Sequence, residues 1–164
     1  CPNEVYETRM GEAMERFRRD GVAAVAFGDL YLEDVRRYRE EKLAGSGIRS
    51  LFPLWGEKTD RLARDMIAGG LRAYVTCVDP KQLDPRFVGR WFDEKFLDAL
   101  PAGVDPCGEN GEFHSFACAG PMFTRPIAVE PGEIVERDGF AFADLLPAGI
   151  ATDDQTGGLP APTR

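Results

Sequence analysis

A chain of 164 residues with 43% hydrophobic and 29% charged residues is long enough to build one domain around a core. Its formal net charge of −8 argues against a nucleic-acid-binding surface, which would need a basic footprint. No apolar run approaches the about 20 residues that cross a membrane, and the N-terminus lacks the basic-then-apolar pattern of a signal peptide.

Helix and strand patterns alternate along the first hundred residues. Apolar residues at helical spacing predict a helix over 3–20, with Asn3 as its N-cap and Gly21 after its last turn. The apolar run 22–27 predicts a buried strand. Further helices are expected at 32–43, 59–68 and 91–100, and further strands at 48–55 and 71–78. This alternation predicts an α/β unit with a parallel sheet and right-handed crossovers.

The pattern changes after residue 100. Strands are predicted at 113–117, 127–129 and 134–142, the last two joined by a turn at 130–133. We therefore predict a nucleotide-binding-type α/β part at 1–100, a smaller mixed α+β part with a substrate loop at 101–148, and a disordered tail at 149–164. The chain opens with Cys1 almost directly before a helix, so we expect an N-terminal element to be missing.

The four cysteines form no Cys-x-x-Cys pair, and the chain has a single histidine. A chain able to bury a core does not need a disulfide framework, so we expect reduced thiols and a cytoplasmic protein. A zinc site would need four ligands, which this composition does not offer, and no metal site is predicted.

Three predicted strands end in residues suited to a ligand. Ligands of open parallel sheets bind at the carboxyl ends of the strands, where Gly28-Asp29, Trp55 and Asp79 would meet. Each also has a structural explanation: Asp29 and Asp79 as caps or turn residues, and Trp55 as a packing residue.

The segment 105–116 is the richest in chemical groups. Gly108 and Gly111 allow a tight turn that carries Glu109 and Glu112. These two acids could bind an amino group, a metal or a proton in transit, or they could form a solvated charged loop. His114 alternates with Glu112, which is compatible with acid–base chemistry.

Two further observations limit the chemistry. Cys107 lies beside this turn without an obvious base, so a nucleophilic role is not favoured. The chain also contains no Gly-x-x-x-x-Gly-Lys-[Ser/Thr] or Gly-x-Gly-x-x-Gly phosphate loop, so the phosphates of any nucleotide would be gripped outside these residues.

The order of these pieces over roughly residues 3–146 resembles the diphthine–ammonia ligase family. The most specific stretch is Gly108-Glu109-Asn110-Gly111-Glu112-Phe113, which is similar to the family's Gly-Glu-x-Gly-Glu-[Phe/Tyr] signature. Other matching stretches are 3–6, 27–30, 53–55 and 69–71. The resemblance implies a Rossmann-like, adenine nucleotide alpha hydrolase-like fold and an N-type ATP pyrophosphatase, although the family's Ser-Gly-Gly-Lys-Asp-Ser loop is absent from this sequence.

The activity implied by the resemblance is ATP-dependent ligation. The substrate would be a small-molecule or modified-residue carboxylate, activated with ATP and Mg²⁺ as an acyl-adenylate and then amidated by ammonia. The implied site residues are Glu109 and Glu112 for catalysis, Gly28, Asp29 and Trp55 for the nucleotide, and Gly108, Asn110, Gly111 and His114 for the substrate. The family also admits a homodimer.

Two other functions remain open at this point. The chain could be a truncated or degenerate nucleotide-fold module that binds a ligand or partner without turnover. It could also be a metal-assisted hydrolase that uses Asp105, Glu109, Glu112 and His114, although their spacing fixes no ligand set.

Overall fold

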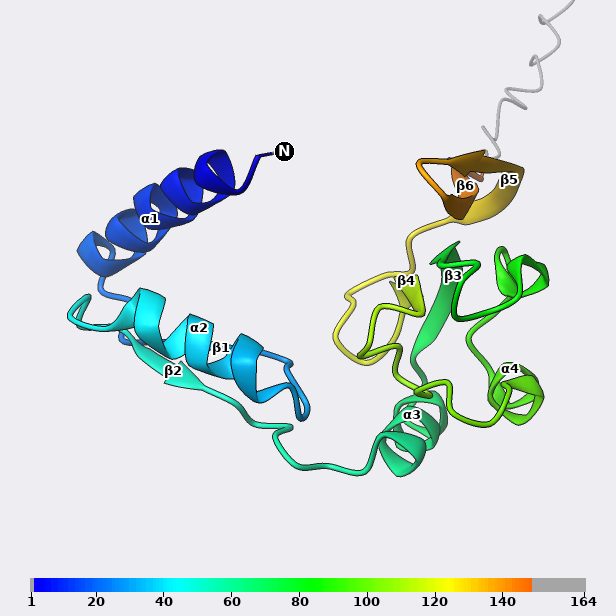
Figure 1. Cartoon of the computed structure of the whole chain (residues 1–164), viewed down its shortest axis with the longest axis horizontal. Coiled ribbons are helices and arrows are strands. Elements are labelled where there is room, and N and C mark those ends of the chain that lie inside the picture. Colours follow the sequence, from blue (N-terminus) through cyan, green and yellow to red (C-terminus); the bar gives the residue numbers. More distant parts are fainter. Residues whose placement is uncertain (1, 149–164) are drawn as a thin grey trace, which may run out of the picture. The chain divides into compact units, whose positions relative to one another are not determined.

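The computed structural model describes residues 2–148, and the predicted tail at 149–164 lies outside the described residues. The chain divides into two compact units, each with its own sheet (Figure 1). Unit 1 comprises residues 1–65 and 105–110, and unit 2 comprises residues 66–104 and the chain from Gly111 onward.

Unit 1 contains a parallel sheet of two strands. Its elements are α1 (Asn3–Arg19), β1 (Ala24–Ala26), α2 (Glu33–Leu43), β2 (Arg49–Leu51) and the start of α3 (Thr59–Ala68). The strands β1 and β2 pair in register from Ala24 with Arg49 to Ala26 with Leu51. The helix α2 packs against β2 (Figure 1).

The helices of unit 1 are close to those predicted, but one cap is wrong. Asn3 is the first residue of α1, and Pro2 holds the N-cap position. Gly21 ends α1 as predicted: its φ of 82° brings the Val22 N–H to the Phe17 carbonyl at 2.9 Å.

The first strand is shorter and less buried than predicted. The expected buried strand at 22–27 is reduced to three residues, of which Ala26 is exposed. A sheet of two strands gives each strand only one hydrogen-bonded neighbour, so it cannot enclose β1 as a central strand of a wider parallel sheet would be enclosed.

Unit 2 contains an antiparallel sheet of four strands in the order β4-β3-β6-β5. Its elements are β3 (Arg72–Val78), the short 3₁₀ helix η1 (Pro85–Phe87), α4 (Glu94–Ala99), β4 (Phe113–Ala119), β5 (Val129–Arg137) and β6 (Phe140–Pro147). The α/β class is therefore confirmed, but the assignment of 71–78 to a parallel sheet is wrong, because β3 pairs antiparallel with β4 and β6.

The C-terminal hairpin differs from the prediction. The residues 130–133 are not a turn: β5 runs through them, with a register shift between Pro131 and Ile134. The turn lies instead at Asp138 (φ 53°) and Gly139 (φ 82°). Asp-Gly with both φ values positive fits the two-residue type I′ hairpin turn, whose twist matches that of the flanking strands.

The core of unit 2 is aromatic. Phe96 is fully buried, and its ring lies 5.2 Å from that of Phe113 and 5.7 Å from that of Phe87. The helix α4 is shorter than the predicted 91–100 because Trp91 stacks on Tyr74 at 3.7 Å, beside β3. The Asp93 side chain then caps α4 by accepting the Phe96 N–H at 2.8 Å.

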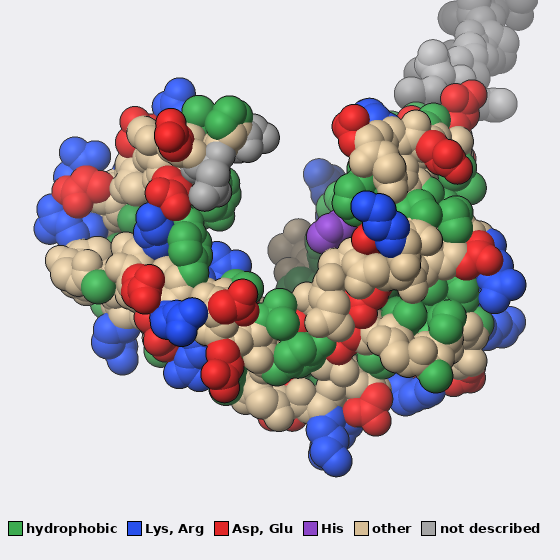
Figure 2. Space-filling model, in the orientation of Figure 1, with side chains coloured by type: hydrophobic (Ala, Val, Ile, Leu, Met, Phe, Trp, Pro, Cys, Tyr) green, Lys and Arg blue, Asp and Glu red, His purple; other side chains and the backbone are tan. Residues whose placement is uncertain are grey.

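Acidic and basic side chains are interspersed over α1 and α2 (Figure 2). Between residues 2 and 148, no helix combines the length and the apolar character needed to cross a membrane.

Candidate functional site

The loops after β1 and β2 form a rim at the carboxyl ends of the two parallel strands. The rim comprises residues 27–31 and 52–56. The Phe27 N–H donates to the Leu51 carbonyl at 2.9 Å, and the Gly56 N–H donates to the Leu30 carbonyl at 2.8 Å. These backbone bonds bring Gly28, Asp29 and Trp55 to the same end of the sheet of unit 1. This is the end at which α/β proteins bind ligands.

Asp29 forms an ion pair at this rim. The Arg39 Nε donates to Asp29 Oδ2 at 2.8 Å, and Arg39 Nη2 donates to Asp29 Oδ1 at 3.3 Å. The hydrogen bond with Asp29 raises the pKa of Arg39 above its usual range. The guanidinium also lies 4.6 Å from the centre of the Phe27 ring. Arg39 therefore offsets the negative charge that Asp29 would otherwise bring to the rim.

Trp55 belongs to a cluster of aromatic rings and a guanidinium. Its ring meets Phe52 edge-to-face at 6.0 Å, and Phe52 stacks on Phe27 at 5.6 Å. The Arg36 guanidinium lies 4.7 Å from the Trp55 ring and 4.8 Å from the Phe52 ring. The indole is partly exposed and held in place by its neighbours.

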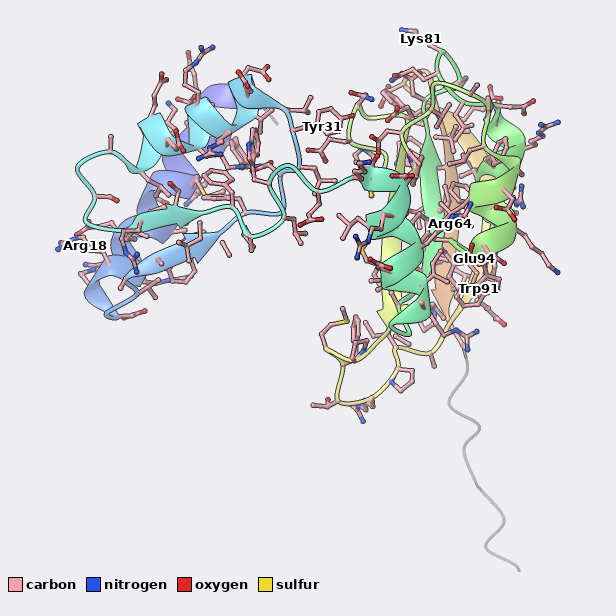
Figure 3. All side chains as sticks on the ribbon, turned by 90° about the horizontal axis from the view of Figure 1, so that it is seen from below. Arg18, Tyr31, Arg64, Lys81, Trp91 and Glu94 are labelled. Atoms are coloured by element: carbon pink, nitrogen blue, oxygen red, sulfur yellow. The ribbon has the colours of Figure 1, made fainter. Side chains whose placement is uncertain are left out.

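The first half of the glycine-rich motif lies at this rim. We call residues 105–110, which belong to unit 1, the motif loop. Glu109 Oε1 accepts the backbone N–H of Leu30 at 2.8 Å, across 79 positions of sequence. The hydroxyl of Tyr31 lies 3.0 Å from Asp105 Oδ2 and 3.2 Å from Asn110 Oδ1. Figure 3 labels Tyr31 on the segment between β1 and α2.

A tight turn shapes the motif loop. Asp105 Oδ1 accepts the Cys107 N–H at 2.7 Å, and the Gly108 N–H donates to the Asp105 carbonyl at 2.9 Å. Gly108 has a φ of 70°, a conformation that favours glycine.

The thiol of Cys107 is turned towards α3. It donates to the Thr59 carbonyl at 3.4 Å. Burial, aided by the nearby carboxylates Asp105 and Glu109, raises the pKa of Cys107 to about 12. The thiol is therefore protonated at neutral pH, which opposes a nucleophilic role.

The second half of the motif belongs to unit 2. Glu112 is buried, with 2% of its surface exposed, and its carbonyl accepts the Asp79 N–H at 2.9 Å. His114 is exposed on β4, opposite Cys77 in register. Gly111 has a φ of 82° at the turn into β4. Glu112 and His114 thus differ in their access to solvent.

Asp79, which precedes a proline, has a structural role in the turn after β3. Its carboxylate accepts the Lys81 N–H at 3.0 Å and the Gln82 amide at 2.9 Å. These bonds hold the turn after β3 and lower the pKa of Asp79.

Of the residues predicted for the site, the structure places Gly28, Asp29, Trp55, Gly108, Glu109 and Asn110 in unit 1, and Gly111, Glu112 and His114 in unit 2. The sequence alone did not point to Tyr31, Arg36 and Arg39. Arg36 and Arg39 looked like part of the solvated face of a charged helix, and their spacing of three on α2, directly after the Gly28-Asp29 corner, was the available signal.

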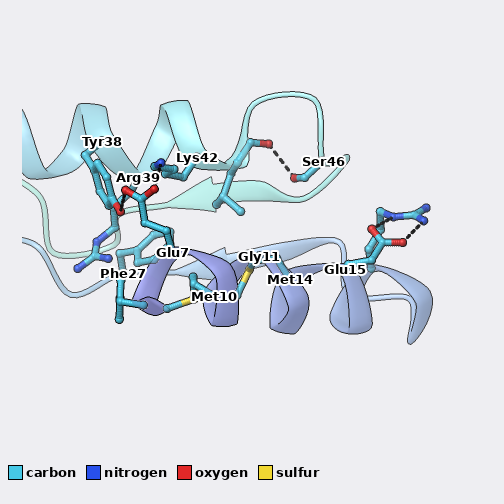
Figure 4. Close-up of a pocket in the computed structure, with 13 residues that line it drawn as sticks. Glu7, Met10, Gly11, Met14, Glu15, Phe27, Tyr38, Arg39, Lys42 and Ser46 are labelled. Atoms are coloured by element: carbon cyan, nitrogen blue, oxygen red, sulfur yellow. Dashed lines mark hydrogen bonds and ion pairs between the residues drawn. The ribbon is translucent and has the colours of Figure 1, made fainter. Parts of the chain in front are cut away.

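A pocket of about 310 Å³ lies between α1 and α2 in unit 1 (Figure 4). Its apolar lining includes Met10, Met14 and Phe27. At one side, Lys42 Nζ lies 2.9 Å from Glu7 Oε2, and the Tyr38 hydroxyl donates to Glu7 Oε1 at 3.3 Å. No feature of the sequence predicted this pocket.

Over residues 2–148, no group of three or more His, Cys, Asp or Glu side chains is arranged to hold a metal ion.

The acidic, glycine-rich motif loop, bonded to the rim at the carboxyl ends of two parallel strands, is the candidate ligand site of this α/β protein. The family model of the diphthamide synthase C-terminal domain matches residues 58–144. The chain belongs to the diphthine–ammonia ligase family.

Individual relatives agree with this family. The chain is 31% identical to the diphthine–ammonia ligase of Homo sapiens over 133 residues, which cover 77% of this chain and 49% of the human protein. It is 32% identical to that of Danio rerio over 137 residues, which cover 80% of this chain and 52% of the Danio rerio protein. It is 30% identical to the diphthine–ammonia ligase of Schizosaccharomyces pombe over 118 residues, which cover 69% of this chain and 19% of that protein. The chain thus spans about half the length of the animal relatives.

Proposed function

We propose that this chain supplies the acceptor-binding part of an ATP-dependent ligase, which activates a carboxylate as an acyl-adenylate and transfers the acyl group to ammonia. The bond between Glu109 Oε1 and the Leu30 N–H is the observation that carries the proposal. It fixes the family's most specific motif at the carboxyl ends of β1 and β2, where a nucleotide would be expected. The relatives are named diphthine–ammonia ligases, which supports the reaction class.

The nucleotide contacts proposed at the rim are Gly28, Asp29 and Trp55. No atom lies within 4 Å of where a Gly28 side chain would begin, so a ligand can approach the backbone there. The ion pair with Arg39 reduces the repulsion that Asp29 would exert on a polyanion. These residues fit contacts to a base and ribose, and we assign them no phosphate contact. Mg²⁺ would accompany the phosphates in this proposal.

The acceptor would approach the motif loop. The Leu30 contact engages Oε1 of Glu109, which leaves its second oxygen to receive a proton from the attacking nitrogen. Asn110 is exposed, and the backbone turns at Gly108 and Gly111 can approach a substrate closely.

Glu112 and His114 have different parts in the proposal. Because Glu112 is 2% exposed, we assign it a structural role within unit 2 rather than contact with the substrate. His114 is exposed, and its proposed contact with the substrate is kept.

The proposed reaction has two steps. A substrate carboxylate oxygen bonds to the α-phosphorus of ATP while the bond to the β-phosphate breaks, so pyrophosphate leaves. Ammonia then attacks the acyl carbon, the bond to AMP breaks with its electron pair, and the nitrogen loses a proton to a base, here Glu109. Holding both reactants at one edge makes the second step effectively unimolecular.

Pyrophosphate exchange tests the proposal in the full-length product of the gene. Labelled pyrophosphate should enter ATP only when the correct acid is present, and candidate acids should include a diphthine-bearing protein. Glu109→Gln should retain exchange but lose amidation about 10²-fold or more, and Glu112→Gln should also reduce amidation. Glu41→Gln, on the exposed face of α2, removes a charge away from the loop and should change neither activity.

Two results would contradict the proposal. Nucleotide binding without exchange for any acid would favour a binding module without turnover. Full amidation by Glu109→Gln would remove the role given to the motif loop.

A further inference from the structure

One phenol is bonded to both ends of the motif loop. Asp105 and Asn110 are the first and last residues of the loop in unit 1, and the Tyr31 hydroxyl lies 3.0 Å and 3.2 Å from their side-chain oxygens. The single phenolic proton can be donated to only one of them at a time, and the charged Asp105 oxygen is the stronger acceptor.

Tyr31 is placed to act together with its neighbour. The backbone N–H of Leu30 binds Glu109, so two consecutive residues of the rim hold the start, the middle and the end of the loop. The Tyr31 side chain is 39% exposed, which means that burial alone does not fix it. Its position over the loop depends on directional hydrogen bonds, which a ring without the hydroxyl cannot make.

We propose that Tyr31 is a positioning residue that clamps the two ends of the motif loop against the rim and so fixes Glu109. The idea that Glu109 is held in place in order to receive an acceptor rests on the proposed function. The clamp itself does not, because it follows from contacts within unit 1 and can be tested without turnover.

Cys107 provides a reporter inside the loop. Its thiol is partly buried and bonded to the Thr59 carbonyl, so it reacts slowly with an alkylating reagent while the loop is docked and faster when the loop opens. Cys77 and Cys118 are buried in unit 2 and report on unfolding elsewhere. Mass spectrometry after timed exposure to iodoacetamide measures each cysteine separately.

Tyr31→Phe removes the clamp and keeps the ring. A hydrogen bond to a charged group stabilises a structure enough that its loss should speed Cys107 alkylation by about tenfold. Alkylation of Cys77 and Cys118 should stay unchanged. Tyr38→Phe is the matched control, since it removes another phenol that donates to a carboxylate of unit 1, Glu7, and should leave Cys107 alkylation unchanged.

A double-mutant cycle identifies the contact. Asp105→Ala should speed Cys107 alkylation less in the Tyr31→Phe background than in the wild type, because the shared bond is already gone. Additive effects would overturn the proposal, as would wild-type alkylation in Tyr31→Phe, an equal rise at Cys77, or an equal effect of Tyr38→Phe. The alkylation result does not depend on pyrophosphate exchange, so the Tyr31 proposal and the proposed ligase function can be refuted independently.

Discussion

The two units of the chain hold themselves together in different ways. Over residues 2–148, the buried apolar side chains of unit 1 are few: Leu30, Leu43, Ile48 and Ala63. The other buried apolar residues all belong to unit 2, where the rings of Phe87, Phe92, Phe96 and Phe113 pack against one another. In unit 1, the rim and the motif loop are held by side-chain hydrogen bonds, an ion pair and guanidinium–ring contacts.

This difference matches where the candidate site lies. The contacts of the rim and of the motif loop are polar, directional and partly exposed, whereas the sheet of unit 2 is fixed by apolar burial. Regions with few buried apolar contacts open more readily, and ligand-binding loops are drawn from such regions.

Phe96→Ala should have the largest effect on stability. Removing a fully buried ring should cost about 3–5 kcal/mol of unfolding free energy in unit 2. The two tryptophans separate the units, since Trp55 belongs to unit 1 and Trp91 to unit 2. In urea titrations, the Trp55→Phe background reports on Trp91 and the Trp91→Phe background reports on Trp55. The loss of unfolding free energy in Phe96→Ala should appear mainly in the Trp91 signal.

The control for this change is Phe116→Ala, whose ring is 38% exposed and should matter much less. An equal loss in the Trp55 signal of the Phe96→Ala variant would mean that the two units unfold as one, and the comparison would break.

Cys107 should be the most protected group of the motif loop. Because its pKa is about 12, against 9.0 for an ordinary thiol, the folded thiolate population at pH 8 is about 1000-fold smaller than in urea. Alkylation should slow accordingly. Because the folded loop disfavours the thiolate, Cys107 leaves stability unchanged below pH 9 and lowers it as pH rises from 9 to 12. Labelling as fast in buffer as in urea would show that the loop is undocked.

The sequence predicted the local elements better than their pairing. The helix ending at Gly21 and the strand β3 were identified from apolar spacing and from the residues at their ends. The direction in which β3 pairs depends on β4 and β6, which are distant in sequence, and nothing local in residues 71–78 encodes it. The Asp138-Gly139 turn did have a local signal, and it was outweighed by the proline-glycine pair at 131–132.

The same limit applies to the site. The glycine-rich motif pointed to Glu109 and Glu112, but the sequence placed them on one loop facing one way. The structure gives Glu109 an amide partner in unit 1 and buries Glu112 in unit 2. Arg39 could not be paired with Asp29 from the sequence, because their ion pair depends on how α2 turns back along the strands.

Replacing one glycine by alanine in each unit should have opposite effects on the free energy of unfolding. Gly139→Ala places a side chain at a φ of 82° in unit 2 and should cost about 1 kcal/mol. Gly11→Ala lies within α1 of unit 1, where no atom within 4 Å opposes a methyl group, and should stabilise by about 0.5–1 kcal/mol. Thermal unfolding of both variants measures this; a destabilising Gly11→Ala would show that α1 needs its glycine for another reason.

Glu7→Gln should produce the smallest change, confined to unit 1 and to pH values above about 4.5, where the carboxylate is charged. The hydrogen bond from Lys42 lowers the pKa of Glu7 below its usual 4.5. A lowered carboxylate pKa contributes stability that is present above pH 4.5 and is lost as pH falls below that value. The stability of unit 1, followed by Trp55 fluorescence during acid titration, should therefore depend slightly less on pH in the variant. The Trp91 signal should stay unchanged, and Glu41→Gln should change neither signal. If Glu7→Gln shifted the Trp91 transition instead, the ion pair beside the α1–α2 pocket would support the whole chain, and unit 1 could no longer be treated as held by its own polar contacts.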